Sequence, residues 1–135
     1  MSNKNQMAFW MCIVLTMLIV LIPLVSLGEA DFHLCSIRYT HTQDIRAALT
    51  LKNGIAHCHG SVAPIGNQDC TITVTLYKKN GSTWSKIKSW SGSAEDGWRA
   101  FVTESITIST GTYKVISVGN VAGEITSAET APKTY

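Results

Sequence analysis

The feature that most constrains the fold is a unit of alternating apolar and polar residues, closed by a turn signal and repeated from Ile45 onward. A period of two is typical of β-strands that bury one face, and no helical pattern competes with it. Seven or eight strands at nearly even spacing predict an all-β fold, a single antiparallel β-sandwich of Ig-like or Greek-key type. The expected strands cover residues 45–52, 55–62, 70–79, 83–91, 101–108, a segment from 112, and 124–131, with 34–39 as a candidate first strand.

The N-terminus predicts export. Residues 1–6 are polar with one Lys, residues 7–27 are apolar and uncharged, and small residues follow. This layout is that of a secretory signal peptide, with cleavage expected after Gly28 or Ala30. The alternative is an uncleaved signal anchor, because 21 apolar residues can cross a bilayer. We therefore expect a signal at 1–30, a β-sandwich domain at 31–135, and a secreted protein, unless an uncleaved signal anchors it to the cell surface.

The charge of the mature part argues against a nucleic-acid partner. From Asp31 to Tyr135 there are ten Lys and Arg residues against eight Asp and Glu, and nucleic-acid binding needs a stronger basic surface. About 105 residues suffice for one domain, which excludes a two-domain protein. No cofactor motif is present, so no cofactor is expected. The oligomeric state is left open.

The pair Asn53-Gly54 predicts a two-residue type I′ hairpin turn, because both central residues need positive φ. In this register Leu49 faces Cys58, which lies on the apolar face. His57 and His59 then lie on the opposite, solvent-facing side.

Three cysteines, Cys35, Cys58 and Cys70, belong to the mature part. Exported domains meet an oxidising environment, so one disulfide and one leftover thiol are expected. If strands 55–62 and 70–79 pair, Cys58 and Cys70 can lie opposite each other and form that disulfide. If the two strands lie in different sheets, Cys35 becomes the expected partner of one of them.

The pair Asn80-Gly81 predicts a second hairpin. A two-residue loop places Ile87 inward against Val74 and leaves five residues outside, whereas a three-residue loop with a bulge would bury the tryptophans and the lysines. Because buried unpaired lysines are costly, we expect the first register. The outward residues are then Tyr77, Trp84, Lys86, Lys88 and Trp90.

This outward row is the expected binding surface. Aromatic side chains can stack on sugar rings or anchor a protein interface, and the two lysines could attract an anionic polymer. Core positions for the tryptophans are the competing interpretation. His57 and His59 could supply two ligands to a metal ion, with a third from His33, His41 or Asp69.

Two further patterns bear on fold and chemistry. Gly111-Thr112-Tyr113 after a turn predicts a tyrosine corner, in which the phenol bonds a backbone group near the turn. No nucleophile lies in a recognisable catalytic motif, so no enzyme activity is expected.

Several short motifs occur in a characteristic order: RYT at 38–40, ALTL at 48–51, GIAHCHGSV at 54–62, TVTLYKK at 73–79, Trp84, KSW at 88–90 and GTYKV at 111–115. In this order they resemble a family of small secreted all-β proteins of unknown function from Gram-positive, clostridial-type bacteria. The resemblance implies export and a small all-β domain, with no catalytic residues to transfer. The leading hypothesis is a non-catalytic binding module for a glycan or protein, and the alternative is a structural or self-associating extracellular protein with no small ligand.

Overall fold

The computed structural model describes residues 39–135, which form eight strands and, within that range, no helix. No segment of this range is a helix long and apolar enough to cross a membrane. The expected signal segment and Cys35 lie outside the described residues. So does the candidate strand at 34–39, apart from Tyr39, which belongs to no strand.

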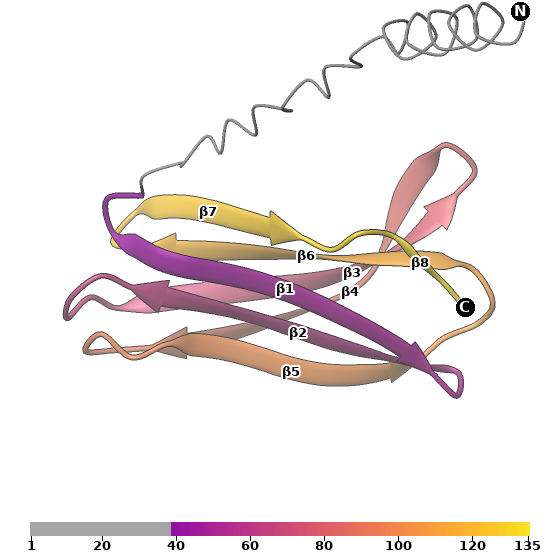
Figure 1. Ribbon diagram of the computed structural model, residues 1–135, viewed down its shortest axis with the longest axis horizontal. Coiled ribbons are helices and arrows are strands. Elements are labelled where there is room, and N and C mark those ends of the chain that lie inside the picture. Colours follow the sequence, from indigo (N-terminus) through magenta and orange to yellow (C-terminus); the bar gives the residue numbers. More distant parts are fainter. Residues whose placement is uncertain (1–38) are drawn as a thin grey trace, which may run out of the picture. The chain divides into compact units, whose positions relative to one another are not determined.

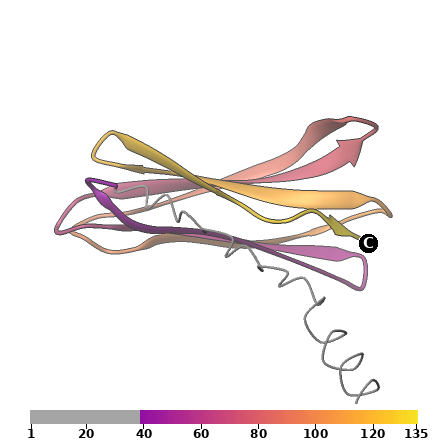
Figure 2. The same cartoon turned by 45° about the horizontal axis from the view of Figure 1, so that its top comes forward.

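The strands form two antiparallel sheets that face each other (Figures 1 and 2). One contains β1 (Thr42–Lys52), β2 (Ile55–Pro64) and β5 (Ala100–Thr107), in the order β1-β2-β5. The other has the order β4-β3-β6-β7, with β8 also pairing with β6. The expected antiparallel β-sandwich is confirmed. The strands of the second sheet are β3 (Cys70–Asn80), β4 (Thr83–Ala94), β6 (Thr112–Val121), β7 (Glu124–Glu129) and β8 (Lys133–Thr134).

The first hairpin has the predicted register. Leu49 lies opposite Cys58 and Ala47 opposite Gly60. The turn residues Asn53 and Gly54 have φ values of 52° and 72°, as a type I′ turn requires. The local turn chemistry therefore sets which face of β2 is buried.

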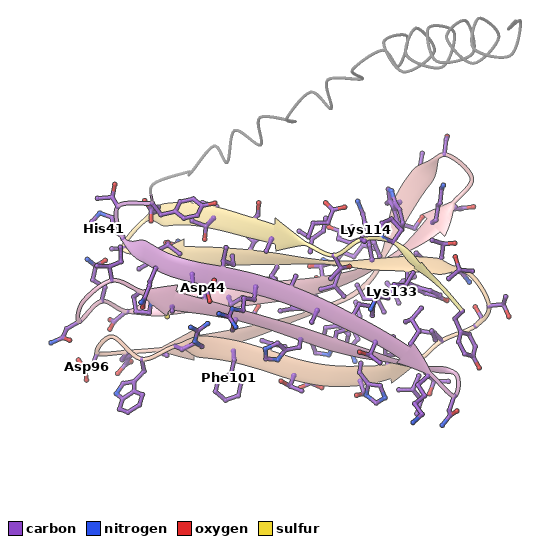
Figure 3. The ribbon with its side chains drawn as sticks, in the orientation of Figure 1. His41, Asp44, Asp96, Phe101, Lys114 and Lys133 are labelled. Carbon is purple, nitrogen blue, oxygen red and sulfur yellow. The ribbon has the colours of Figure 1, made fainter. Side chains whose placement is uncertain are left out.

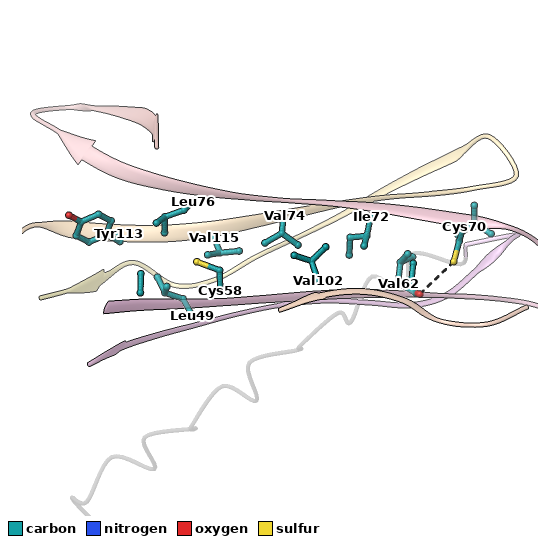
Figure 4. Packing of buried hydrophobic residues seen from close by; sticks show 13 residues of the cluster. Leu49, Cys58, Val62, Cys70, Ile72, Val74, Leu76, Val102, Tyr113 and Val115 are labelled. Carbon is teal, nitrogen blue, oxygen red and sulfur yellow. Dashed lines mark hydrogen bonds between the residues drawn. The ribbon is translucent and has the colours of Figure 1, made fainter. Parts of the chain in front are cut away.

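The core lies between the two sheets (Figure 4). Alternate residues of β3 point inward and are at most 2 % exposed, as its sequence pattern predicted. They pack against apolar side chains of β2, which lies across the sandwich, and of β6, the neighbouring strand in the same sheet. The buried residues of β3 are Cys70, Ile72, Val74 and Leu76, and their partners include Cys58, Val62, Val115 and Val121.

The tyrosine corner is confirmed. The Tyr113 hydroxyl donates a 2.7 Å hydrogen bond to the carbonyl oxygen of Ser109, and the residue is 2 % exposed. Ser109 lies in the connection from β5 to β6, where the chain passes from one sheet to the other. The bond therefore fixes the crossover between the two layers.

The direct pairing of Cys58 with Cys70 is wrong. Cys58 lies on β2 and Cys70 on β3, and these strands belong to different sheets. Both residues are buried, and among residues 39–135 neither forms a disulfide. The connection after β2 crosses between the layers instead of forming a hairpin, so the assumed register never arises.

The second hairpin departs from the predicted register in two ways. Its turn residues are Gly81 and Ser82, because Asn80 pairs with Thr83. Only Gly81 has positive φ, at 62°, as in a type II′ turn. A bulge between Lys86 and Lys88 then leaves Ile87 without a paired residue on β3.

This bulge reverses which residues of β4 face inward. Val74 lies opposite Trp90, and Leu76 opposite Lys88. The prediction that Ile87 packs inward against Val74 is therefore wrong, and Ile87 is 43 % exposed.

The expected last edge strand is present as β7, which ends at Glu129. Pro132 follows it, and β8 comes after the proline and pairs with β6. The chain therefore adds one short strand beyond the predicted end of the sheet.

Candidate binding surface

The predicted aromatic row divides at the bulge of β4. Tyr77, Trp84 and Lys86 lie on the outer face of the second sheet, as expected, with Tyr77 opposite Lys86. Trp90 and Lys88 lie on the inner-face side, contrary to expectation. Trp90 is half-buried against the core, with the Lys88 Nζ atom 5.6 Å from its ring centre. The five residues therefore do not form one continuous platform.

Trp84 is held in place by a cation. The Nζ atom of Lys114 lies 4.5 Å from its ring centre, a cation–π contact. The same ammonium group donates a 2.8 Å hydrogen bond to Glu129. One face of the indole is therefore already occupied by a side chain of the protein.

Charge is separated along the sandwich. The seven lysines of the described residues lie at the end that holds the turns β1–β2, β3–β4 and β5–β6, together with β8. Five of the seven acidic residues of the described part lie toward the opposite end, where Arg46 and Arg99 pair with one of them, Asp44, so this end keeps a net negative formal charge (Figure 3). The lysines are 52, 78, 79, 86, 88, 114 and 133, and the acids of the other end are Asp44, Asp69, Glu95, Asp96 and Glu124.

Three lysines of the β3–β4 hairpin are exposed. Among residues 39–135, Lys79, Lys86 and Lys88 form no hydrogen bond or ion pair through their ammonium groups, whereas Lys78 donates to the Ser109 hydroxyl. Between Cys70 and Ala94 the chain has no acidic residue. The hairpin is thus a basic surface without internal neutralisation.

A shallow pocket lies on this hairpin. It has a volume of about 290 Å³, and it is lined by two lysines, an asparagine, a serine and an isoleucine. Such a mixed lining can hold a polar ring that carries a negative charge. The lining residues are Lys78, Lys79, Asn80, Ser85 and Ile87. We call this pocket, with Lys86 and Lys88, the lysine hairpin.

The most exposed aromatic residues lie elsewhere. Trp98 is 76 % exposed in the β4–β5 connection, and Phe101 is 65 % exposed on the outer face of β5, pointing away from the sheet (Figure 3). Sequence reasoning did not select Phe101. Ala100 and Val102 point inward, so strict alternation through β5 would have placed Phe101 outside.

His57 and His59 share the outer face of the β1-β2-β5 sheet, as predicted. The Nδ1 atom of His57 lies 2.7 Å from the Ser105 hydroxyl, and that of His59 lies 2.8 Å from the Thr103 hydroxyl. The described residues contain no group of three or more His, Cys, Asp or Glu that could hold a metal ion.

The expected third metal ligands are not beside this pair. His41 hydrogen-bonds Gln68 at 3.2 Å, and Asp69 accepts a hydrogen bond from the Asp96 backbone at 3.1 Å. His33 lies outside the described residues.

The carboxyl group of Glu124 and the thiol of Cys58 have shifted pKa values. Burial alone would raise the pKa of Glu124, but hydrogen bonds from Thr40, His41 and Thr42 outweigh it and lower the pKa to about 2. The three backbone donors lie 2.7, 3.0 and 2.7 Å from its carboxylate oxygens. Burial raises the pKa of the Cys58 thiol to about 11, so it is protonated at neutral pH.

No family model and no curated protein matches the chain. Among solved structures, CsgH from R. palustris matches with a TM-score of 0.44 and 10 % identity, over 64 % of this chain and 88 % of CsgH. The E. coli curli protein CsgC matches with a TM-score of 0.42 and 16 % identity, over 65 % of this chain and 96 % of CsgC. OgpA from Akkermansia muciniphila matches with a TM-score of 0.45 and 10 % identity, over 72 % of this chain and 32 % of OgpA. Because these TM-scores are all below 0.5, the similarities assign no function to this chain.

Proposed function

We propose that the chain is an exported, non-catalytic binding module that holds an anionic glycan on the lysine hairpin. The observation that carries this proposal is the set of exposed lysines Lys79, Lys86 and Lys88 on a hairpin that has no acidic residue and that also carries a shallow pocket. Export is supported by the signal-like N-terminus and by the resemblance to small secreted proteins. We take the strand order, β1-β2-β5 facing β4-β3-β6-β7, to be of Ig-like type.

The lining of the pocket favours a sugar over a protein surface. Asn80 and Ser85 can exchange hydrogen bonds with ring hydroxyls, and Ile87 offers a small apolar contact. The ammonium groups supply attraction to carboxylate, phosphate or sulfate substituents. A protein interface would need a larger central apolar patch than one exposed isoleucine provides.

A binding experiment tests this proposal. The exported form is titrated with teichoic acid, with an acidic mucin glycan and with uncharged dextran, at low and high salt. We expect the two anionic polymers to bind, dextran not to bind, and salt to weaken binding by screening.

Charge-removing variants locate the surface. Lys79→Gln combined with Lys86→Gln is expected to weaken binding by about tenfold, since exposed ion pairs contribute up to ~1 kcal/mol each. Lys52→Gln is the matched control, because Lys52 is exposed at the same end but lies off the hairpin. Equal loss from both variants would mean that general charge, not the lysine hairpin, attracts the polymer.

A second candidate function is end-to-end self-association, which the separation of charge along the sandwich favours. The basic end of one copy would face the acidic end of the next, and such a head-to-tail contact can continue into a filament. Sedimentation at rising concentration tests it. A mass that grows with concentration at low salt and falls at high salt supports self-association, whereas a constant mass rejects it.

A further inference from the structure

We propose that His57 and His59 together bind one divalent transition-metal ion through their Nε2 atoms, and bind Cu²⁺ more tightly than Zn²⁺. The site lies on the outer face of the β1-β2-β5 sheet, on the other layer from the lysine hairpin. It therefore stands independently of the proposed glycan function.

The strand brings the two imidazoles to the same side. His57 and His59 are two residues apart on β2, and the flanking Ala56, Cys58 and Gly60 point inward. Alternate residues of a strand lie roughly 7 Å apart on one face. Side chains of this length can reach a common ion at metal–nitrogen distances of about 2.0 Å.

Hydroxyl groups on β5 orient both rings. Ser105 lies directly opposite His57 in the strand register, and Thr103 lies opposite His59. Each hydroxyl is within hydrogen-bond distance of the Nδ1 atom of its histidine, at 2.7 and 2.8 Å. Both rings are thus held through Nδ1, which leaves both Nε2 atoms for a ligand.

The chemistry of the orienting partners suits metal binding. Nε2 can bind a metal only when the ring proton is on Nδ1, which must then donate a hydrogen bond. A hydroxyl can accept that bond or donate to an unprotonated Nδ1, so Ser105 and Thr103 keep their contacts in either tautomer. Partners on the second nitrogen are a regular part of histidine metal sites.

The neighbours on β1 leave the pair accessible. Thr50 lies opposite His57, and Ala48 lies opposite His59, and neither side chain carries a charge. Two neutral imidazoles suit Cu²⁺ and Zn²⁺, and the general order of divalent affinities places Cu²⁺ above Zn²⁺. Water would complete the coordination, because the described residues offer no third ligand here.

Metal titration tests the pair in the exported form with its N-terminal amine acetylated, because cleavage after Ala30 would expose Asp31-Phe32-His33, an N-terminal sequence that binds Cu²⁺ through its free amine and His33. We expect one Cu²⁺ per chain, a raised Tm, and a Cu²⁺ EPR spectrum with coupling to two imidazole nitrogens, with a smaller rise in Tm for Zn²⁺. His57→Ala and His59→Ala should each abolish the Tm shift over the same concentration range. His41→Ala and His33→Ala are the controls and should leave it unchanged.

Three results would overturn the proposal: no Tm shift with either ion, a shift that survives both His57→Ala and His59→Ala, or a shift that His41→Ala or His33→Ala removes. The metal-free Tm is measured for each variant and is expected to match the wild type, because both side chains lie on the outer face of the sheet.

The orienting role of the hydroxyls has its own test. Ser105→Ala and Thr103→Val should each weaken Cu²⁺ binding by about 10- to 100-fold, the usual cost of losing a partner on the second nitrogen. Ser105→Thr restores a hydroxyl and should restore affinity. Unchanged affinity in both hydroxyl-free variants would contradict this positioning role.

Discussion

Lys114 lies over Trp84, with its Nζ atom 4.5 Å from the ring centre. The lysine side chain is only 13 % exposed and bonds Glu129 at the same time. Together the three residues connect β4, β6 and β7 across the outer face of the sheet. Trp84 is therefore part of a fixed surface cluster and not a free stacking platform.

The first prediction concerns tryptophan accessibility. Trp98 is 76 % exposed, whereas Trp84 and Trp90 are half-buried. In the exported form, Trp98→Phe should remove most of the iodide-quenchable fluorescence and shift the emission maximum to shorter wavelength. If Trp84→Phe has that effect instead, the contact with Lys114 does not persist in solution.

The second prediction concerns the tyrosine corner. Tyr113→Phe removes the hydrogen bond to Ser109 and should lower the free energy of unfolding by about 1 kcal/mol, measured by urea denaturation. Tyr77→Phe is the control, because the Tyr77 hydroxyl forms no hydrogen bond within the described residues. Equal effects of the two changes would contradict a special role for the corner.

The third prediction concerns acid stability. The pKa of Glu124 is about 2 in the folded protein, below the usual value for an unfolded chain of about 4.3. The ionised form therefore stabilises the fold above the unfolded pKa, and this contribution is lost as the pH falls through about 2. Glu124→Gln should be less stable than wild type at pH 7, and the difference should shrink between about pH 4 and pH 2.

Denaturation curves across this pH range measure the effect. Glu95→Gln is the matched control, because Glu95 is exposed and its carboxylate forms no hydrogen bond or ion pair among residues 39–135. A stability difference for Glu124→Gln that stays constant down to pH 2 would contradict the role of its ionised carboxylate.

The fourth prediction concerns Gly60, where β2 lies close to β3 and β6 of the facing sheet. A Cβ atom at Gly60 would lie 2.4 Å from the Ser117 Oγ and 2.4 Å from a Val74 methyl group. Gly60→Ala should therefore cost about 1–3 kcal/mol in the free energy of unfolding, measured by urea denaturation.

Ser117→Ala provides the matched test of that contact. Its hydroxyl is buried without a hydrogen-bond partner, so its removal should not destabilise the fold and should relieve part of the Gly60→Ala cost in the double variant. Strictly additive effects of the two changes would show that Ser117 does not restrict this position.

The sequence predicted those parts of the fold that depend on neighbouring residues. The first hairpin follows from Asn53 and Gly54, because their positive φ values fix the register and hence the burial of Cys58. The tyrosine corner at Tyr113 was likewise predicted from a short local motif, Gly111-Thr112-Tyr113. Both need no knowledge of distant strands.

The errors have a shared physical source in long-range structure. The bulge at Ile87 is not encoded by the turn, and it turns Trp90 and Lys88 to the inner side. The cost of burying a lysine favours the other register, but Lys88 lies on an edge strand and remains exposed. The cost applies to enclosed positions, and alternation does not show which strand forms an edge.

The pairing of Cys58 with Cys70 failed for a related reason. The expected hairpin assumed that consecutive strands are neighbours, whereas the chain crosses between layers after Pro64. Among the candidate binding residues, the sequence placed Lys86, His57 and His59 on the correct faces and Lys88 on the wrong one. It could not show that Lys114, distant in sequence, covers Trp84.

Glu124 also determines how the domain would resist mechanical load. Its carboxylate holds the backbone amides of Thr40, His41 and Thr42, where the described chain enters β1. A force applied to the chain just before β1 would first act on these three hydrogen bonds, which transmit it to β7. It would reach the hydrogen bonds between β1 and β2 only afterwards. Protonation of the Glu124 carboxylate would therefore lower the force at which β1 detaches.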